Sequence, residues 1–437
     1  MTLGPGDGFI ERDRDMLVVT NYRGEPNQFD GKIERHGTNK PELRQKLIHD
    51  HLLERGYRFH VPWMGMTEND LVDLGVHDSD YLCFLRNAYT SYVETPDSDY
   101  ERPDGIIPYH FSRHDGAFDV GRQQLPYWKQ MGYYGDDVLT PINGDTYKIA
   151  MQSANNCYVA GQLIDGDDAG ADVGADADAG VDIIYCLNTY PGHHATHRGY
   201  SGYCYLNNAY VCAGKLVKDG HRVAVLDVDY HAGTHDVPVT GFRKNARTNV
   251  ETLFRVFGLG MLVLSMLIWG MSSVYLVLFG MFPLVTLLGA ERIYPIFRRV
   301  FPGRIMTISI HADPRADYPT FSGFEEENTA ENKNIIFPPK ATWAEYSVCL
   351  ARALDQIRRF DPDVVVVPFG GDTYKEDGDA SKLYGCALEL DDYVKMGRMI
   401  GGLGKKVVVT QEGGYCMEKM PQIVDNLLTG LSSGMKS

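Results

Sequence analysis

Short apolar runs rich in valine and isoleucine recur along the chain. They cover residues 16–22, 183–187, 306–310, 364–368 and 406–410, and a similar run opens at Val223. Strands that are buried on both faces of a parallel sheet have this near-continuous apolar character. The pattern therefore predicts a set of buried parallel strands.

Helical patterns fill the intervals between these runs. They lie at residues 39–56, 147–163, 207–219, 343–360 and 390–403. The first has Pro41 in its first turn and ends at Gly56, and both features are typical of helix boundaries. Because strands alternate with helices, we predict an α/β fold with a mostly parallel central sheet flanked by helices.

Two polar segments interrupt this pattern. Residues 95–121 are rich in Asp, Pro, Arg and His, and we predict a long surface loop whose His110 and His114 are solvated. Residues 165–182 are acidic and of low complexity. Their closely spaced aspartates lack the D-x-D-x-D-G order and the distal Glu of a calcium loop, so we predict a flexible surface insertion.

A third segment, residues 256–290, contains no charged residue. It is longer than the about 20 apolar residues that a helix needs to cross a bilayer. Arg255 and Arg292 are among the basic residues that flank it on both sides, so its orientation is not fixed. Three interpretations stay open: a membrane anchor in a long loop, a buried hairpin, or translated sequence that is absent from the functional protein. We predict a cytoplasmic or nuclear location, and a membrane location only if the segment is real.

The composition and charge limit which kinds of molecule the protein is expected to bind and the compartment in which it is expected to work. The formal net charge is −16, which argues against direct nucleic-acid binding and is compatible with a cationic substrate. The eight cysteines include no C-x-x-C pair, which indicates free thiols in a reducing compartment. The N-terminus has no basic-then-apolar signal pattern. Whether the chain forms a homo-oligomer is left open.

The strand that opens at Val223 ends in side chains that can bind a metal. Asp227, Asp229 and His231 occupy alternate positions at this end. In an open parallel sheet, ligands bind just outside the carboxyl ends of the strands. Asp229 and His231 leave the strand on one side, so both can reach one ion.

Other strand ends carry polar groups as well. His193 and His194 follow residues 183–187, Ser309 and His311 end the run at 306–310, Asp372 follows 364–368, and Tyr415 follows 406–410. Asp229, His231 and Asp372 provide three ligands and leave an open position, which is typical of catalytic zinc and also suits Fe(II) or Co(II). A histidine pair can supply base and acid, and a tyrosine hydroxyl can stabilise an oxyanion. We therefore predict metal-assisted hydrolysis.

Five motifs together resemble those of the zinc-dependent histone deacetylase superfamily. They read P-G-H-H-A, D-V-D-Y-H, S-I-H-A-D-P, G-G-D-T-Y and E-G-G-Y, and they are most similar to the acetylpolyamine amidohydrolase-like and class II deacetylase-like branch. The resemblance implies a single arginase-like deacetylase domain over residues 14–437. This domain is interrupted by the acidic low-complexity loop at 165–182 and by the insertion at 237–304, which contains the apolar segment. The resemblance also implies an enzyme that uses one Zn²⁺ per chain to hydrolyse the acetyl amide of acetyl-lysine or acetylpolyamine substrates.

The same resemblance implies a role for each site residue. His194 is the general base and acid, His193 is its electrostatic partner and is oriented by Asp227, and Tyr415 stabilises the tetrahedral intermediate. The remaining expectations are zinc ligands at Asp229, His231 and Asp372, a structural K⁺ site at Asp227 and Ser309, and a substrate channel lined by Tyr203 and Tyr318.

One motif departs from the family pattern. After the metal-binding histidine the family reads H-G-N-G or H-G-D-G, whereas residues 232–235 read A-G-T-H. The Asn or Asp that orients the second catalytic histidine is therefore missing or displaced. This departure, together with the apolar segment, motivates an alternative: a catalytically impaired, membrane-tethered scaffold. Hydrolysis of another C–N bond, as in arginase-like relatives, is a third hypothesis.

Overall fold

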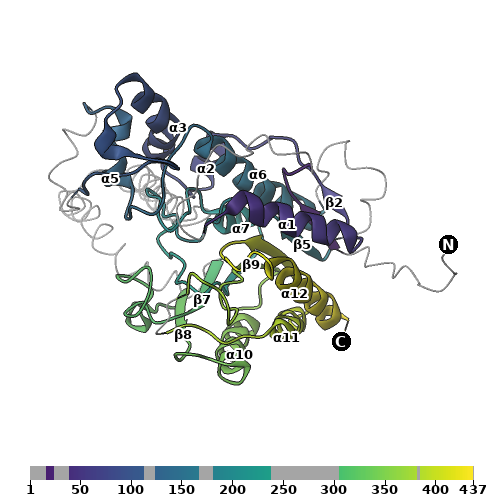
Figure 1. The fold of residues 1–437 in the computed structure, drawn as a ribbon. Helices are drawn as coiled ribbons and strands as arrows, with labels where there is room; N and C mark the ends of the chain where they lie inside the picture. Colours follow the sequence, from purple (N-terminus) through teal and green to yellow (C-terminus); the bar gives the residue numbers. More distant parts are fainter. Residues whose placement is uncertain are drawn as a thin grey trace, which may run out of the picture.

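An eight-stranded parallel sheet forms the centre of the structure (Figure 1). The computed structural model describes residues 16–23, 39–112, 124–166, 181–237, 305–380 and 384–436. The strand order is β2-β1-β5-β10-β9-β6-β7-β8, and each neighbouring pair is parallel. The strands are β1 (Met16–Val19), β2 (Phe59–His60), β5 (Ile183–Cys186), β6 (Val223–Asp227), β7 (Ile305–His311), β8 (Asn332–Ile336), β9 (Val364–Phe369) and β10 (Lys406–Gln411). The predicted α/β fold is confirmed.

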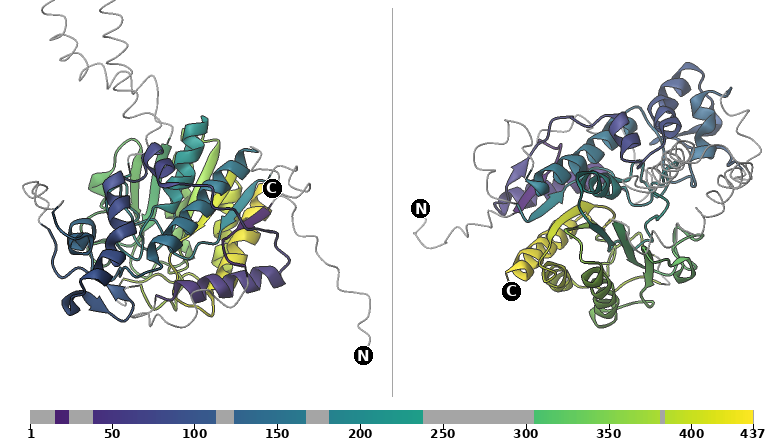
Figure 2. Two further views of the ribbon diagram at one scale, coloured as in Figure 1. Left: turned by 90° about the horizontal axis from the view of Figure 1, so that it is seen from above. Right: turned by 180° about the vertical axis from the view of Figure 1, so that it is seen from behind.

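Helices cover both faces of this sheet (Figure 2). One face packs against α3 (Ser79–Glu94), α6 (Thr146–Asp165) and α7 (Asn208–Asp219). The other face packs against α1 (Pro41–Glu54), α10 (Trp343–Phe360), α11 (Leu390–Gly401) and α12 (Met420–Met435). Shorter helices are α2 (Glu68–Asp73), α5 (Met131–Tyr134), η1 (Ser98–Tyr100), η2 (Tyr127–Gln130) and η3 (Glu325–Glu327).

Strand β9 shows why the strands read as continuous apolar runs. Val364 and Val366 belong to the core on the α6 side, whereas Val365 and Val367 belong to the core on the α10 side. Alternate side chains of a strand point to opposite faces, so both sets must be apolar when helices cover both faces.

The carboxyl ends of five neighbouring strands, β5, β10, β9, β6 and β7, meet at one edge of the sheet. These are the strands whose following residues carry the predicted site. The parallel direction of all neighbouring pairs therefore gathers residues that are far apart in the sequence.

The predicted long loop at 95–121 is partly folded, so this prediction is wrong for its first half. It contains η1 and a small antiparallel pair, β3 (Glu101–Arg102) and β4 (Gly105–Ile106). These elements are too short to give a periodic signal, and the buried Tyr100 of η1 packs against the buried Trp128. The rings of Tyr100 and Trp128 lie 4.7 Å apart. His110 is exposed as predicted, and His114 lies outside the described residues.

Several boundaries and elements differ from the prediction. The first strand ends at Val19 rather than at residue 22. The sequence pattern missed β8, which begins with the polar residues N-K-N because it is an edge strand, and the two-residue β2. The sequence pattern also missed α12, because its glycines and serines weaken the helical pattern, although much of this helix is buried.

The apolar segment 256–290 and most of the acidic segment 165–182 lie outside the described residues. None of the helices in the described part of the chain is long and apolar enough to cross a membrane. The three interpretations of the apolar segment, the domain limits and the location stay predictions. All eight cysteines are free thiols.

Glycines allow α11 and α12 to approach closely. A Cβ atom at Gly430 would lie 2.2 Å from the Val394 carbonyl oxygen, and one at Gly397 would lie 2.2 Å from that of Leu427. These distances are far shorter than a van der Waals contact, so an added methyl group would push the helices apart.

We expect Gly430→Ala to lower the free energy of unfolding by about 1–3 kcal/mol because it overpacks this contact. Urea denaturation of the full chain measures the change. Gly65→Ala is the matched control, because no atom lies within 4 Å of its added Cβ. Equal stability of the two variants would contradict the close-packing argument.

Candidate active site

The three residues predicted as metal ligands converge at the ends of β6 and β9. Asp229, His231 and Asp372 are all buried, and one potential ligand atom from each lies within 4.8 Å of the others. The Nδ1 atom of His231 is 3.2 Å from Asp372 Oδ2 and 3.4 Å from Asp229 Oδ1. Strands β6 and β9 are neighbours in the sheet, which explains how residues so distant in sequence meet.

This group of side chains fits a divalent cation. Burial and repulsion from Asp229 raise the pKa of Asp372 to about 8, so the two carboxylates resist being charged together. A bound cation removes that repulsion. Gly370 leaves room beside the carboxylates, since a Cβ there would lie 1.9 Å from Asp229 Oδ2 and 2.6 Å from Asp372 Oδ1. Two carboxylates and one imidazole are a donor set that catalytic metals use.

His193 is held in a charged environment. Its Nδ1 atom lies 3.0 Å from Asp227 Oδ2, and its Nε2 atom lies 3.7 Å from Asp229 Oδ1. Burial would lower the pKa of His193, but Asp229 and Asp227 outweigh burial and raise it to about 10. Without a bound cation, His193 is therefore an imidazolium at neutral pH and donates from Nδ1 to Asp227.

His194 has the opposite environment. Its ring centroid lies 3.9 Å from that of His193 and 6.0 Å from that of His231. Burial and these two histidines hold the pKa of His194 well below its usual value. The imidazole is therefore neutral and able to accept a proton.

The A-G-T-H turn, where the sequence departs from the family motif, contacts the loop that carries the two histidines. The backbone of Ala232 raises the pKa of His194, against the larger effects of burial and of the neighbouring histidines. The Thr234 hydroxyl accepts a hydrogen bond from Asp236 N at 3.0 Å, and Thr234 N donates to the His193 carbonyl at 2.8 Å. The Thr234 backbone thus joins this turn to the loop that carries the two histidines.

Aromatic side chains surround the histidines. The Tyr318 ring lies 4.7 Å from the His194 ring, and the Tyr203 ring lies 6.1 Å from the Tyr415 ring. Gly202 precedes Tyr203 with φ +53°, and a Cβ there would lie 2.3 Å from His194 Cδ2. Burial raises the pKa of Tyr415 well above its usual value, so its hydroxyl stays protonated.

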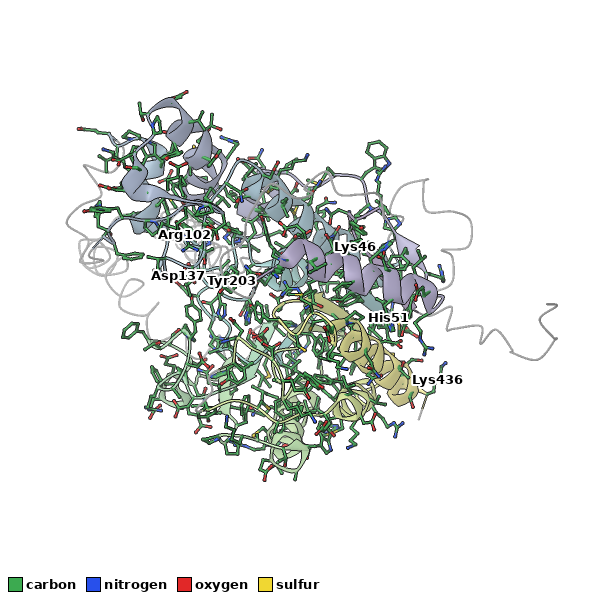
Figure 3. The ribbon with its side chains drawn as sticks, viewed as in Figure 1. Lys46, His51, Arg102, Asp137, Tyr203 and Lys436 are labelled. Atoms are coloured by element: carbon green, nitrogen blue, oxygen red, sulfur yellow. The ribbon has the colours of Figure 1, made fainter. Side chains whose placement is uncertain are left out.

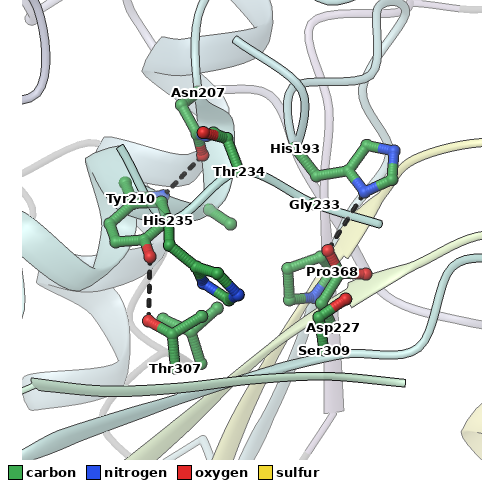
Figure 4. Close-up of a pocket in the computed structure, with 12 residues that line it drawn as sticks. His193, Asn207, Tyr210, Asp227, Gly233, Thr234, His235, Thr307, Ser309 and Pro368 are labelled. Atoms are coloured by element: carbon green, nitrogen blue, oxygen red, sulfur yellow. Dashed lines mark hydrogen bonds and ion pairs between the residues drawn. The ribbon is translucent and has the colours of Figure 1, made fainter. Parts of the chain in front are cut away.

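Asp227 and Ser309, the predicted structural cation site, are register partners on β6 and β7. Both line a small cavity together with His193 and His235 (Figure 4). The Ser309 hydroxyl lies 2.7 Å from His311 Nδ1. Binding of K⁺ at this position stays a prediction.

The sequence pattern missed Arg44. This arginine of α1 is fully buried, and its Nη1 donates to the Gly414 carbonyl oxygen at 3.2 Å. Its guanidinium carbon lies 5.8 Å from the centre of the Tyr415 ring. The sequence pattern could have revealed its burial, because Arg44 lies one helical turn from buried Ile48, on the helix face where an apolar residue is expected.

The sequence pattern also missed Glu412 in the E-G-G-Y motif. Its carboxylate accepts hydrogen bonds from the backbone of Gly192 and His193. The sequence could have indicated a paired, buried carboxylate here, because a charged residue directly follows a buried apolar strand, where unpaired charges are rare.

We expect Gly413→Ala to weaken divalent-cation binding about 10- to 100-fold, because it disturbs groups that orient the ligands. The added Cβ would lie 2.6 Å from Asp372 Oδ2 and 2.7 Å from Asp229 Oδ2. Isothermal titration of the metal-free chain with Zn²⁺ measures the affinity, with Gly65→Ala as the control. Unchanged affinity would show that the two carboxylates do not form the cation site.

Comparisons with known proteins agree with this geometry. The sequence matches the histone deacetylase domain over residues 39–236 and 297–431, so the match leaves out the apolar segment. Acetylpolyamine amidohydrolase 2 of Pseudomonas aeruginosa is 27% identical over 361 residues, which are 81% of this chain and 80% of that protein. Histone deacetylase 8 of Arabidopsis thaliana is 23% identical over 257 residues, which are 57% and 53% of the two chains.

A solved structure shows the same fold. The crystal structure of acetylpolyamine aminohydrolase from Burkholderia pseudomallei has a TM-score of 0.69 and 23% identity, and the similarity covers 96% of this chain and 99% of that one. The domain match covers most of the sequence and confirms the resemblance seen in its motifs. The chain belongs to the histone deacetylase domain family and is a hydrolase that acts on amides.

Proposed function

We propose that this protein is a zinc-dependent deacetylase whose substrates are acetylpolyamines or similar acetylated amines with a second, cationic nitrogen. Relatives named acetylpolyamine amidohydrolases support this substrate class. The observation that carries the proposal is a group of carboxylates beside the channel tyrosines, next to the metal-ligand cluster.

Asp137 is the best defined of these carboxylates. Its Oδ2 accepts hydrogen bonds from Gly202 N at 2.6 Å and from the Tyr318 hydroxyl at 3.3 Å. Figure 3 shows Asp137 beside Tyr203. Burial, followed by Asp379 and Asp137, raises the pKa of Tyr203, so a second carboxylate also acts on this ring.

The charge of Asp137 is available for a substrate. In the described part of the chain, its hydrogen-bond donors are backbone N–H groups and hydroxyls rather than a side-chain cation. The nearby Arg102 instead pairs with Asp104 at 3.2 Å and with the Val138 carbonyl. An ammonium group in the channel would therefore gain from Asp137, and the net charge of −16 would attract cations from a distance.

The reaction uses the two histidines in different roles. When bound to Asp229, His231 and Asp372, zinc supplies a Lewis acid that polarises the amide carbonyl and acidifies water. Neutral His194 removes the proton from the attacking water and later gives a proton to the leaving nitrogen. His193, held by its hydrogen bond to Asp227, supplies electrostatic stabilisation of negative charge. The Tyr415 hydroxyl donates a hydrogen bond to the oxyanion.

Two further assignments belong to this proposal. Tyr203 and Tyr318 line the channel for the acylated chain, and Asp227 with Ser309 binds a structural K⁺. The membrane tether of the alternative, an impaired scaffold, has no support in the described part of the chain, where no helix is long and apolar enough to cross a membrane.

Removal of the metal is expected to abolish acetate release from a monoacetylated diamine, and one equivalent of Zn²⁺ per chain is expected to restore it. The measurement is acetate release by protein whose zinc content is followed by elemental analysis.

His194→Ala should lower kcat by about 100-fold or more at full zinc occupancy, because it removes the proton-transfer group. Full turnover by zinc-free protein or by His194→Ala would overturn the mechanism.

Asp137→Asn is expected to raise KM for a monoacetylated diamine about tenfold, which corresponds to about 1.4 kcal/mol of lost ammonium binding. KM for an acetylated monoamine of the same length should change little, because that substrate has no second ammonium. Asp99→Asn, which changes an exposed acid on η1, is the control. Equal effects of Asp137→Asn on both substrates would rule out charge recognition by this residue.

A further inference from the structure

Glu412 is a fully buried carboxylate directly after β10. Its Oε2 atom accepts hydrogen bonds from Gly192 N at 2.5 Å and from His193 N at 3.0 Å. Its Oε1 atom accepts one from the Thr410 hydroxyl at 2.8 Å. One side chain therefore joins the end of β10 to the loop that carries both catalytic histidines.

The residues that follow Glu412 contact other parts of the same site. Gly413 N donates to Asp229 Oδ2 at 2.9 Å, and the Gly414 carbonyl accepts from Arg44 at 3.2 Å. Tyr415 N donates to Asp377 Oδ2 at 2.6 Å. The segment 412–415 thus sets the histidine loop, a metal ligand and the oxyanion-stabilising tyrosine relative to one another.

A carboxylate at this position is costly, so its hydrogen bonds must offset the cost of burial. Burial raises the pKa of Glu412 to about 7, although His193 and the hydrogen bonds lower it. An apolar side chain would leave the backbone N–H groups of Gly192 and His193 without their acceptor. The opposite side of the loop is closely packed, since a Cβ at Gly192 would lie 2.5 Å from Asn208 N.

We propose that Glu412 is a positioning residue that fixes the His193–His194 pair against the metal ligands and Tyr415 through its hydrogen bonds to the Gly192 and His193 backbone. The predicted loss of turnover in Glu412 variants rests on the proposed deacetylase function. The predicted displacement of the histidine loop in Glu412 variants does not rest on that function, because it concerns hydrogen bonds of the protein without substrate.

Two substitutions separate geometry from charge. Glu412→Gln keeps the side-chain length, and its carbonyl oxygen can accept both backbone hydrogen bonds while its NH₂ group donates to Thr410. Glu412→Asp keeps the charge but is one methylene too short to reach the loop. Thr410→Val is the matched control, because it removes only the third hydrogen bond from the same buried carboxylate.

We expect Glu412→Asp to lower kcat about 100-fold, the size of effect that a displacement of about 1 Å in a catalytic group produces. KM and zinc affinity should stay close to those of the unmodified protein. Glu412→Gln should retain kcat within about tenfold, and Thr410→Val within about threefold, because both keep the bonds to the loop. The same activity in Glu412→Asp as in the unmodified protein, or a larger loss in Glu412→Gln than in Glu412→Asp, would overturn the proposal.

A spectroscopic readout tests the positioning without any turnover. In protein labelled with ¹⁵N-histidine, the Nδ1–H signal of His193, which reports its bond to Asp227, should shift or broaden in Glu412→Asp but not in Glu412→Gln or Thr410→Val. An unchanged signal in Glu412→Asp would overturn the proposal. If the unmodified protein releases no acetate from any acetylated amine, the proposed function fails, and this signal still decides the role of Glu412.

Discussion

The proposed active site depends on the confinement of two carboxylates and one imidazole in a buried space. Asp229 and Asp372 follow neighbouring parallel strands, and Gly370 leaves room for their close approach. Buried like charges are unfavourable unless a cation accompanies them. The raised pKa of Asp372 expresses this cost. The fold thus builds a position that favours a divalent cation before any substrate arrives.

The groups around this position divide the chemistry between them. The carboxylates of Asp227 and Asp229 keep His193 charged, whereas burial beside other histidines keeps His194 neutral. Such opposite environments support the proposed roles of electrostatic stabilisation for His193 and proton transfer for His194. Farther out, Asp137 adds negative charge beside the channel tyrosines. The proposed preference for an acetylated amine with a second positive charge follows from this arrangement.

The parallel sheet and the clustering of Asp229, His231 and Asp372 could be predicted from the sequence, because both depend on local order: apolar runs followed closely by these residues. The sequence did not predict Arg44 and Glu412, whose roles depend on contacts with residues 370 and 220 positions away. The structural effect of A-G-T-H was also inaccessible, because it depends on the hydrogen bond from Thr234 N to the His193 carbonyl, which the motif alone does not reveal. Short elements such as the two-residue strands β3 and β4 left no periodic pattern.

The most direct test of the central claim is anomalous X-ray diffraction at the zinc edge from crystals of the full chain grown with Zn²⁺. The account predicts one strong peak within bonding distance of Asp229, His231 and Asp372, with His194 and Tyr415 facing the open coordination position. A strong peak elsewhere, or none at these three residues at full zinc saturation, would contradict the claim that their confinement creates the catalytic centre.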